Sequence, residues 1–252
     1  MEQSDWRKTI ESIARNKISV VTVFSDFCRV AACAVALQTR EEEYLETIAH
    51  YSKEEIHEFS KAFAFLVNEM QSKPFTDVLG PFYTSVASKM TVSGRGEFYT
   101  PPEVCELMAR IIGDVDRVIE EGKPITVNEP SCGSAGTILA LAKQYAPKEE
   151  GEPSYVDLLR VTCQDLSPTA CDMAYVNLTL WGVPAKIYRG NTLENKYDMV
   201  WKNMHWIRVG EDRRLRDLAM FDELKSITTK LTPTREAFPE VETGFDQAVF
   251  DF

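Results

Sequence analysis

The sequence predicts an α/β fold in which a helical N-terminal domain precedes a parallel β-sheet flanked by helices. In residues 1–90, apolar residues recur at spacings of three and four, as at Phe24 and Phe27, which is typical of amphipathic helices. In residues 91–252, short apolar runs alternate with helical segments, as in strands joined by crossover helices. The small, glycine-rich stretch 91–96 marks the predicted boundary between these two domains.

Several elements can be placed within this outline. In the first domain, Ser52 followed by Glu55 predicts a capping box at a helix start. The apolar run 18–38 contains Asp26 and Arg29, which favours a core helix over a membrane span. The second domain is predicted to contain helices at 102–112, 134–145 and 169–181, and strands at 125–128, 161–164, 185–188 and 197–201. A further helix is expected over 211–231 and a further strand near 247–250.

The charge and the cysteines narrow the classes of function. The 252-residue chain has a net charge of −11, which disfavours non-specific nucleic-acid binding but leaves a local basic patch open. The six cysteines form no C-x-x-C pair and the three histidines are far apart, so no metal site is predicted. The N-terminus lacks a signal-peptide pattern. We therefore expect reduced thiols and a cytoplasmic location.

Two strand ends carry candidate ligand-binding residues. The first strand ends in Glu129 and leads into a loop with Gly133 and Gly136, which lets a ligand approach the backbone closely. The acid favours a ligand carrying an amine or cation over a pyrophosphate, and a tight turn without a ligand is the alternative. The second strand ends in Asp165, which could accept both hydroxyls of a ribose. The alternative for Asp165 is capping the next helix.

Three segments in order resemble the S-adenosylmethionine-dependent DNA adenine-N6 methyltransferases: GEFYTPPEVCELMARII, NEPSCGSAGTILALA and CQDLSPTACDMAYVNLTLWG. They look most like the modification subunits of type I restriction systems and their stand-alone phage and plasmid relatives. The resemblance covers about residues 95–206 and extends more weakly to FTDVLGPFY, which begins at Phe75. It implies a Rossmann-like methyltransferase sheet. Because a complete sheet has seven strands and only 46 residues follow Trp206, the sheet is expected to be truncated.

The resemblance also implies a binding site for S-adenosyl-L-methionine. Residues 98–101 match the motif that borders the methionine part, Glu129 lies near its amine, and Leu166 flanks the adenine. Asn191 replaces an Asp that is usual in the family, and a plain turn residue is its alternative. The implied cofactor-binding residues are Phe98, Tyr99, Thr100, Pro101, Glu129, Pro130, Ser131, Cys132, Gly133, Gly136, Asp165, Leu166 and Asn191.

The catalytic motif of this family is matched by YDMVWKNMHW, residues 197–206. Asn203 would accept the hydrogens of the adenine N6 amine with the carbonyl that follows it, and Trp206 would stack on the flipped base. Met204 and His205 replace the two prolines of the family, so the stiffness that prolines confer is missing. The alternative is that Asn203 and His205 only terminate a strand.

These residues imply DNA as substrate and partner. Basic residues beside the catalytic motif are candidates for phosphate contacts, namely Lys202, Arg208, Arg213 and Arg214, or they form a solvated helix face. Because no target-recognition domain is evident, a specificity subunit or a homodimer is expected to read the DNA sequence. One alternative is a degenerate relative that acts through a partner or as an anti-restriction or regulatory factor. Another is methylation of RNA, protein or a small molecule.

Overall fold

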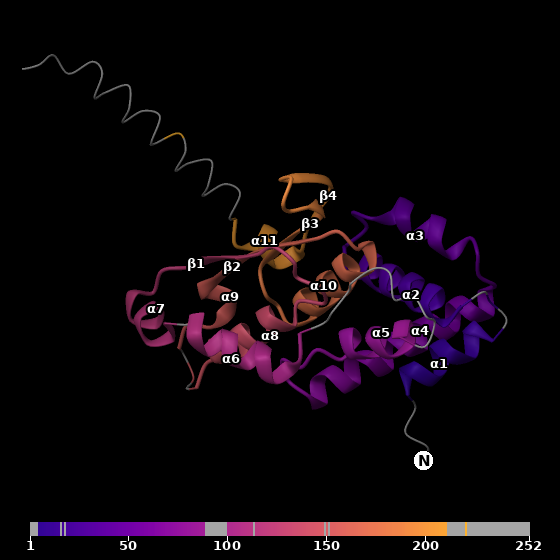
Figure 1. The fold of residues 1–252 in the computed structure, drawn as a ribbon, viewed down its shortest axis with the longest axis horizontal. Helices are drawn as coiled ribbons and strands as arrows, with labels where there is room; N and C mark the ends of the chain where they lie inside the picture. The colour runs from indigo at the N-terminus through magenta and orange to yellow at the C-terminus, as the bar shows by residue number, and fades with distance from the viewer. Residues whose placement is uncertain are drawn as a thin grey trace, which may run out of the picture. The chain divides into compact units, whose positions relative to one another are not determined.

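The computed structural model describes residues 5–15, 17, 19–88, 100–112, 114–148, 150, 152–210 and 220. The chain divides into two compact units, 1–211 and 212–252. The account below is of the first unit, which contains both the helical region and the sheet (Figure 1). The division into domains at residue 90 stays a prediction. Apart from Met220, the helix expected over 211–231 lies outside the described residues, as does the strand expected near 247–250.

The helical region contains α1 (Trp6–Ala14), α2 (Val20–Ala34), α3 (Glu41–Ile48), α4 (Lys53–Ser72) and α5 (Leu79–Ser88). Polar caps begin three of these helices: Asp5, Ser19 and Ser52 each accept a hydrogen bond from a backbone N–H of the first turn. The capping box predicted at Ser52 and Glu55 is confirmed. Aromatic rings fill the centre of this region, among them Trp6, Phe24, Phe27, Phe59 and Phe82.

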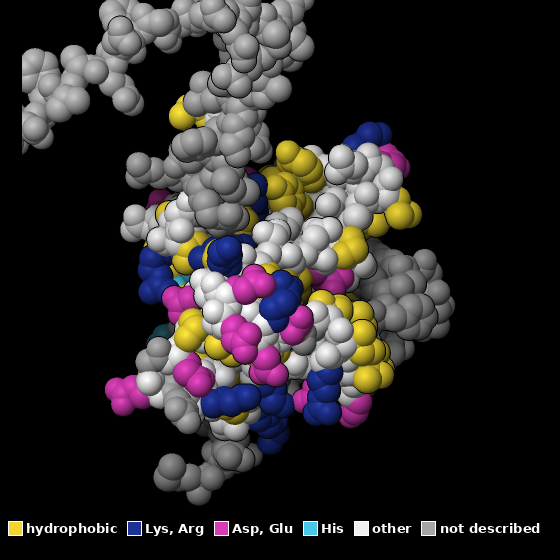
Figure 2. Space-filling view, turned by 90° about the vertical axis from the view of Figure 1, so that its left-hand side faces the viewer, with side chains coloured by type: hydrophobic (Ala, Val, Ile, Leu, Met, Phe, Trp, Pro, Cys, Tyr) yellow, Lys and Arg dark blue, Asp and Glu magenta, His cyan; other side chains and the backbone are white. Residues whose placement is uncertain are grey.

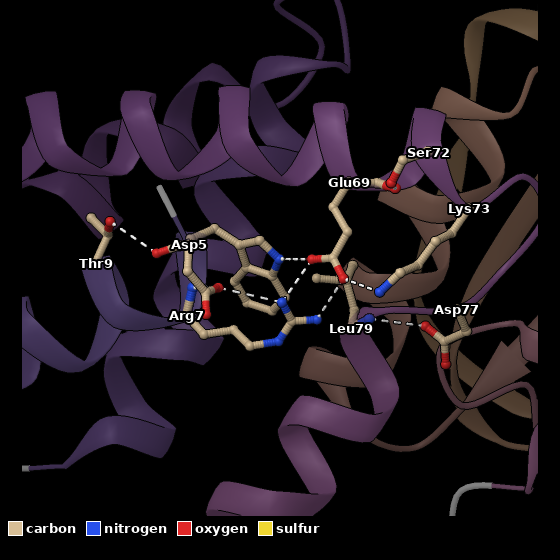
Figure 3. Close-up of polar contacts among 9 residues, drawn as sticks. Asp5, Arg7, Thr9, Glu69, Ser72, Lys73, Asp77 and Leu79 are labelled. Carbon is tan, nitrogen blue, oxygen red and sulfur yellow. Dashed lines mark hydrogen bonds and ion pairs between the residues drawn. The ribbon is translucent and has the colours of Figure 1, made fainter. Parts of the chain in front are cut away.

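Glu69 joins the first and fourth helices (Figure 3). Its carboxylate accepts hydrogen bonds from Trp6 Nε1 at 2.7 Å, from Arg7 Nη1 at 2.7 Å and from Lys73 Nζ at 2.8 Å. Burial alone would raise the pKa of Glu69, but these three donors outweigh it and lower the pKa to about 2. The ionised carboxylate therefore holds α1 against α4.

The second region contains α6 (Pro102–Ile112), α7 (Val115–Glu121), β1 (Ile125–Glu129), α8 (Gly136–Gln144), α9 (Tyr155–Leu158), β2 (Leu159–Asp165), α10 (Pro168–Leu180), β3 (Ala185–Asn191), β4 (Lys196–Lys202) and α11 (Met204–Arg208). The predicted helix 102–112 has the same bounds as α6, and the other elements predicted between residues 125 and 201 agree to within three residues at each end. The sequence reading missed α7, α9 and α11, which are short. No helix in the described part is long and apolar enough to span a membrane.

The sheet has the order β1-β2-β3-β4. β1, β2 and β3 are parallel, with α8 and α10 in the crossovers, and this confirms the predicted Rossmann-like α/β fold. The prediction that the strand at 197–201 continues the parallel sheet is wrong: β4 pairs antiparallel with β3. Only a short turn separates Asn191 from Lys196, and a parallel crossover needs a dozen or more residues.

The helix α10 links the two regions, because it packs against β2 and β3 and also against α2. Its Asp172 is buried and accepts hydrogen bonds from Arg40 Nη2 at 2.8 Å and Arg29 Nε at 3.2 Å. Arg40 also bonds Glu43, which accepts a hydrogen bond from Trp201 Nε1 in β4. The helical region and the sheet therefore share one buried ionic cluster.

Candidate functional site

The carboxyl ends of the three parallel strands meet at one edge of the sheet, which we call the carboxyl edge. Glu129 ends β1, Asp165 ends β2 and Asn191 ends β3. The loop from β1 to α8, residues 130–135, passes across this edge and is called the β1–α8 loop. The structure thus brings together strand-end residues that the sequence predicts as cofactor ligands. In open α/β sheets, ligands bind in the crevice outside this edge.

Asp165 fastens the β1–α8 loop to β2. Its Oδ2 accepts a hydrogen bond from Gly133 N at 2.9 Å, and its Oδ1 accepts one from Ser167 N at 2.9 Å. Ser167, not Asp165, caps α10, so the helix-capping alternative for Asp165 does not hold. A carboxylate offers about four lone-pair directions, so each oxygen keeps a direction for a hydroxyl group of a ligand.

Glu129 places a second carboxylate beside Asp165. Burial raises the pKa of Glu129, and the negative charge of Asp165 raises it further, while a hydrogen bond from Ser131 N acts in the opposite direction. Within the described residues, neither carboxylate has an ion pair with a lysine or arginine. Two adjacent acids without a cation suit a ligand that carries positive charge and sugar hydroxyls. These two carboxylate acceptors therefore fit the sulfonium, the amine and the ribose hydroxyls of S-adenosylmethionine.

The backbone of the β1–α8 loop has two residues in the left-handed region, Gly133 at φ 53° and Ala135 at φ 68°. Cys132 N donates to Gln164 O at 3.0 Å, and Ala135 N donates to Cys132 O at 2.7 Å. Ala135 is the N-cap residue of α8, and its methyl side chain cannot accept a hydrogen bond. The first N–H groups of α8 therefore have no hydrogen bond to the side chain of their N-cap residue. The loop is thus held in a tight turn whose backbone faces the carboxyl edge.

The remaining predicted cofactor residues lie around this loop. Leu166 follows Asp165 with 68% of its surface exposed, which suits a flat contact with an adenine ring. Asn191 Oδ1 accepts hydrogen bonds from Leu193 N and Glu194 N, so its side chain shapes the β3–β4 turn. The neighbouring Thr192 donates from Oγ1 to Pro130 O at 2.5 Å, which ties this turn to the β1–α8 loop.

A cavity of about 340 Å³ lies beside the start of α8. It is lined by Thr100 and Pro101, which were predicted as cofactor residues, and by Gly136, Asp77 and Cys105 among others. A volume of this size lies at the lower end of small-molecule sites. Phe98 and Tyr99, predicted with them, lie outside the described residues.

The predicted catalytic residues lie at the other edge of the sheet. Because β4 is antiparallel, its end at Lys202 pairs with Lys186, near the start of β3. Asn203 is fully buried: its Oδ1 accepts from Ala185 N at 3.1 Å and from Trp206 N at 2.9 Å. Its Nδ2 donates to Val183 O at 2.7 Å. Asn203 bonds Ala185, whereas Asp165 pairs with Arg189, four residues further along β3, so about 13 Å at about 3.3 Å per residue separates them along the strand.

The residues after Asn203 in the predicted catalytic motif also have structural surroundings. Trp206 is 2% exposed, so its ring has no free face for a base. His205 Nε2 lies 3.0 Å from Thr179 O, and burial lowers the pKa of His205. Met204 is exposed at the start of α11. The expectation that residues 203–206 line one site with Asp165 is not met in this structure, because a hairpin carries them to the opposite edge.

The basic residues predicted to contact DNA divide into two groups. Lys202 and Arg208 are exposed beside Asn203, while Arg213 and Arg214 lie outside the described residues. On the face seen in Figure 2, lysine and arginine side chains are interspersed with aspartate and glutamate.

Within the described residues, no group of three or more His, Cys, Asp or Glu side chains could hold a metal ion, and the six cysteines are buried as free thiols.

Sequence reasoning missed one set of buried polar residues near the loop: Asp77, Ser134 and Asn177. Asp77 Oδ2 accepts from Ser134 Oγ at 2.5 Å, and Asn177 Nδ2 donates to Asp77 Oδ1 at 3.1 Å. Asn177 interrupts an apolar helical run, which is a sequence signal of a buried polar contact. Its partners are far away in the sequence, so the sequence alone could not have named them.

The chain is similar to solved structures of two methyltransferases, at low sequence identity. The chain is similar to a protein described as a class I S-adenosylmethionine-dependent methyltransferase from Listeria monocytogenes, with 15% identity over 77% of this chain and a TM-score of 0.43. It is also similar to the methyltransferase subunit of a type I restriction-modification system from Streptococcus thermophilus, with 17% identity over 77% of this chain and a TM-score of 0.40. The chain spans 55% and 40% of the lengths of these two proteins. No curated protein matches the sequence.

A family model described as N-6 DNA methylase matches residues 75–210, which is more than half of the 252-residue chain. The match includes the carboxyl edge, the β1–α8 loop and the hairpin of β3 and β4. It starts at Phe75, where the weaker part of the resemblance begins. The chain therefore belongs to the N-6 DNA methylase family, whose methyl donor is S-adenosylmethionine.

Proposed function

We propose that this chain binds S-adenosylmethionine at the carboxyl edge and uses it to methylate N6 of adenine in DNA. One observation carries the proposal: Glu129 and Asp165 lie side by side at this edge, without a lysine or arginine partner within the described residues, next to a loop that Asp165 fastens. When bound, the cofactor supplies a methyl group on a sulfonium, which is already an activated leaving group. The chain's own task is therefore to position the reactants.

Each residue has a role in this proposal. Asp165 accepts the ribose hydroxyls, and the exposed Leu166 packs on the adenine of the cofactor. Glu129 lies near the positively charged end, where its charge is stabilised although burial raises its pKa. Thr100 and Pro101 border the methionine part through the cavity beside α8. The target adenine is flipped out of the duplex, because its N6 amine is not accessible to an enzyme inside the stack.

DNA is the proposed partner, together with a specificity subunit or a second copy of the chain that reads the sequence. Lys202 and Arg208 are the described candidates for phosphate contacts, and binding through them should weaken as salt rises. A cytoplasmic location is part of the same proposal.

The placement of Asn203 supports a second candidate function, in which the chain binds the cofactor but does not transfer the methyl group by itself. All three hydrogen bonds of the Asn203 amide are made to the backbone of the chain, so they do not serve a substrate. Such a protein would act through a partner, for example as a regulator of a restriction-modification system.

Calorimetry with S-adenosylmethionine tests the cofactor site. We expect the wild type to bind, and Asp165→Ala to lose at least tenfold in affinity, because a hydrogen bond to a charged group contributes about 1.5–3 kcal/mol. Asp116→Ala, which changes an exposed aspartate of α7, is the matched control and should bind like the wild type. Equal affinity in the wild type and Asp165→Ala would refute the site.

Mass spectrometry for N6-methyladenine in DNA from expressing cells separates the two functions. Modified adenine that depends on Asp165 supports the enzyme, whereas cofactor binding without modified adenine supports the second function. The variant Asn203→Ala tests the predicted catalytic role. If modified adenine persists in this variant, Asn203 is not the acceptor of the N6 hydrogens.

A further inference from the structure

We propose that Asp77 is a positioning residue for cofactor binding, which acts through Ser134 to set the shape of the β1–α8 loop. The inference rests on the proposed function, because the ligand of that loop is taken to be S-adenosylmethionine. Asp77 lies before α5 in the helical region, more than 50 residues from the loop in sequence. It would therefore make the geometry of the cofactor site depend on the helical region.

The two oxygens of Asp77 have different tasks. Oδ1 accepts hydrogen bonds from Leu79 N and Gly80 N, both at 3.1 Å, at the start of α5; the first is drawn in Figure 3. Oδ1 also accepts one from Asn177 Nδ2 of α10 at 3.1 Å. Oδ2 accepts one from Ser134 Oγ at 2.5 Å. One oxygen thus caps a helix and bonds α10, while the other holds the loop.

Ser134 is held on both its side chain and its backbone. Its hydroxyl donates to Asp77, and its carbonyl accepts a hydrogen bond from Asn177 Nδ2 at 2.8 Å. The residue is 2% exposed. Its neighbour Gly133 donates its N–H to Asp165, and its other neighbour Ala135 has a left-handed backbone. A displacement of Ser134 would therefore move the N–H that Asp165 binds, which is the contact at the centre of the cofactor site.

The chemistry explains why an acid occupies this position. Four donors converge on Asp77, and only a carboxylate is an acceptor on both of its oxygens. Burial raises the pKa of Asp77, and the hydrogen bonds from Ser134, Gly80, Asn177 and Leu79 oppose that rise. The substitution Asp77→Asn keeps the size and one acceptor oxygen, but its NH₂ group would face the Ser134 hydroxyl.

Asp77 also lines the cavity that Thr100, Pro101 and Gly136 line. A Cβ placed on Gly136 would lie 3.8 Å from Oδ2 of Asp77, so the carboxylate is next to the first residue of α8. Asp77 therefore borders both ends of the short segment from Ser134 to Gly136. A role limited to capping α5 would not explain this second set of contacts.

The test compares two variants that change the Asp77–Ser134 contact with one that removes a similar contact elsewhere. Ser134→Ala deletes the bond to Oδ2 and leaves the cap of α5 intact, and Asp77→Asn reverses the donor. The control is Tyr51→Phe, which removes a 2.7 Å hydrogen bond from Tyr51 to the carboxylate of Asp26 in the helical region. For each protein, calorimetry measures the affinity for S-adenosylmethionine and circular dichroism measures the melting temperature. Hydrogen–deuterium exchange of the ligand-free protein measures the opening of the loop amides.

We expect Ser134→Ala and Asp77→Asn to weaken cofactor binding about tenfold and to speed exchange in the β1–α8 loop, as loss of a hydrogen bond to a charged group would do. The double variant should bind S-adenosylmethionine no more weakly than the single variant with the lower affinity, because both changes act on the same contact. Tyr51→Phe should lower the melting temperature without changing affinity or loop exchange.

The proposal is overturned if both variants bind within twofold of the wild type and the loop exchanges at its normal rate. Asp77 would then have only a structural role, even if the melting temperature falls. Failure of the wild type to bind S-adenosylmethionine would instead refute the proposed function. The exchange measurement on ligand-free protein still tests whether Asp77 holds the loop, so the two failures are distinguishable.

Discussion

The substitution Arg40→Met is expected to destabilise the protein strongly, because it removes one partner of a buried ion pair. The side chains of Arg40 and Asp172 are each 1% exposed, and their atoms lie 2.8 Å apart. Removing one member of such a pair costs about 3–5 kcal/mol, since the other charge stays buried. Asp172 keeps its contact with Arg29 at 3.2 Å, and the Arg29 side chain is 31% exposed. We therefore expect a loss near the lower end, about 3 kcal/mol.

This loss should be measured as the free energy of unfolding in urea and as the melting temperature. For a unit of this size, about 3 kcal/mol corresponds to a fall of roughly 6–12 °C. Burial raises the pKa of Asp172, and Arg40 and Arg29 lower it. Without Arg40, the pKa should rise further, and stability should fall as pH rises through it. The deficit relative to the wild type should therefore be smaller at pH 5 than at pH 8.

The matched control is Lys61→Met, which breaks a 2.7 Å ion pair with Glu58 on the surface of α4. The two side chains are 48% and 43% exposed, so this change should cost less than about 1 kcal/mol. Equal, small losses for Arg40→Met and Lys61→Met would show that the buried cluster does not stabilise the fold, and would refute the reasoning.

Three further predictions concern other parts of the chain. The pKa of Glu69 is about 2 against an ordinary value of 4.5, so the ionised carboxylate should stabilise the fold above about pH 4.5 and lose this effect as pH falls toward 2. Solvent screening limits the stabilisation to about 1 kcal/mol. Glu69→Gln should abolish this pH dependence in acid titrations of unfolding. In Gly190→Ala, the new Cβ would overlap the backbone oxygen of Lys196, so urea unfolding should show a loss of about 1–3 kcal/mol. An unchanged midpoint would mean that the hairpin adapts freely. Asn203→Ala should lower the free energy of unfolding by about 1–3 kcal/mol, because buried backbone groups such as Ala185 N lose their partner. Calorimetry should show unchanged affinity for S-adenosylmethionine. Weaker binding at unchanged stability would contradict the position of Asn203 in the structure.

The elements that the sequence predicts well are those whose signals are local. The helix 102–112 follows Pro101, and its bounds agree with α6 because proline at the start of a helix needs no distant partner. Ser52 and Glu55 satisfy each other across one turn, so the capping box could be identified from spacing alone. Likewise, Glu129 and Asp165 could be placed at one edge because parallel strands bring their carboxyl ends together.

The direction of β4 was harder to predict. The apolar residues around Trp201 indicate a strand but not its neighbour, because a strand pairs through backbone groups that every residue has. The resemblance assigned residues 197–206 to the active-site strand. The spacing of the two predicted strands indicates a hairpin instead, because the first ends at Tyr188, the second begins at Tyr197, and no helix is predicted between them. A hairpin is the simplest connection of that length, and it carries Asn203 away from Asp165.

The ionic cluster around Asp172 also has a consequence for the order in which the chain can assemble during synthesis. Arg40 and Asp172 are 132 residues apart in sequence. At about 5–20 residues per second, a ribosome needs roughly 7–26 s to reach Asp172 after it has made Arg40. For this interval Arg40 has Glu43 beside it but not Asp172. The early helices can form within microseconds of leaving the ribosome, yet their final packing has to wait for α10.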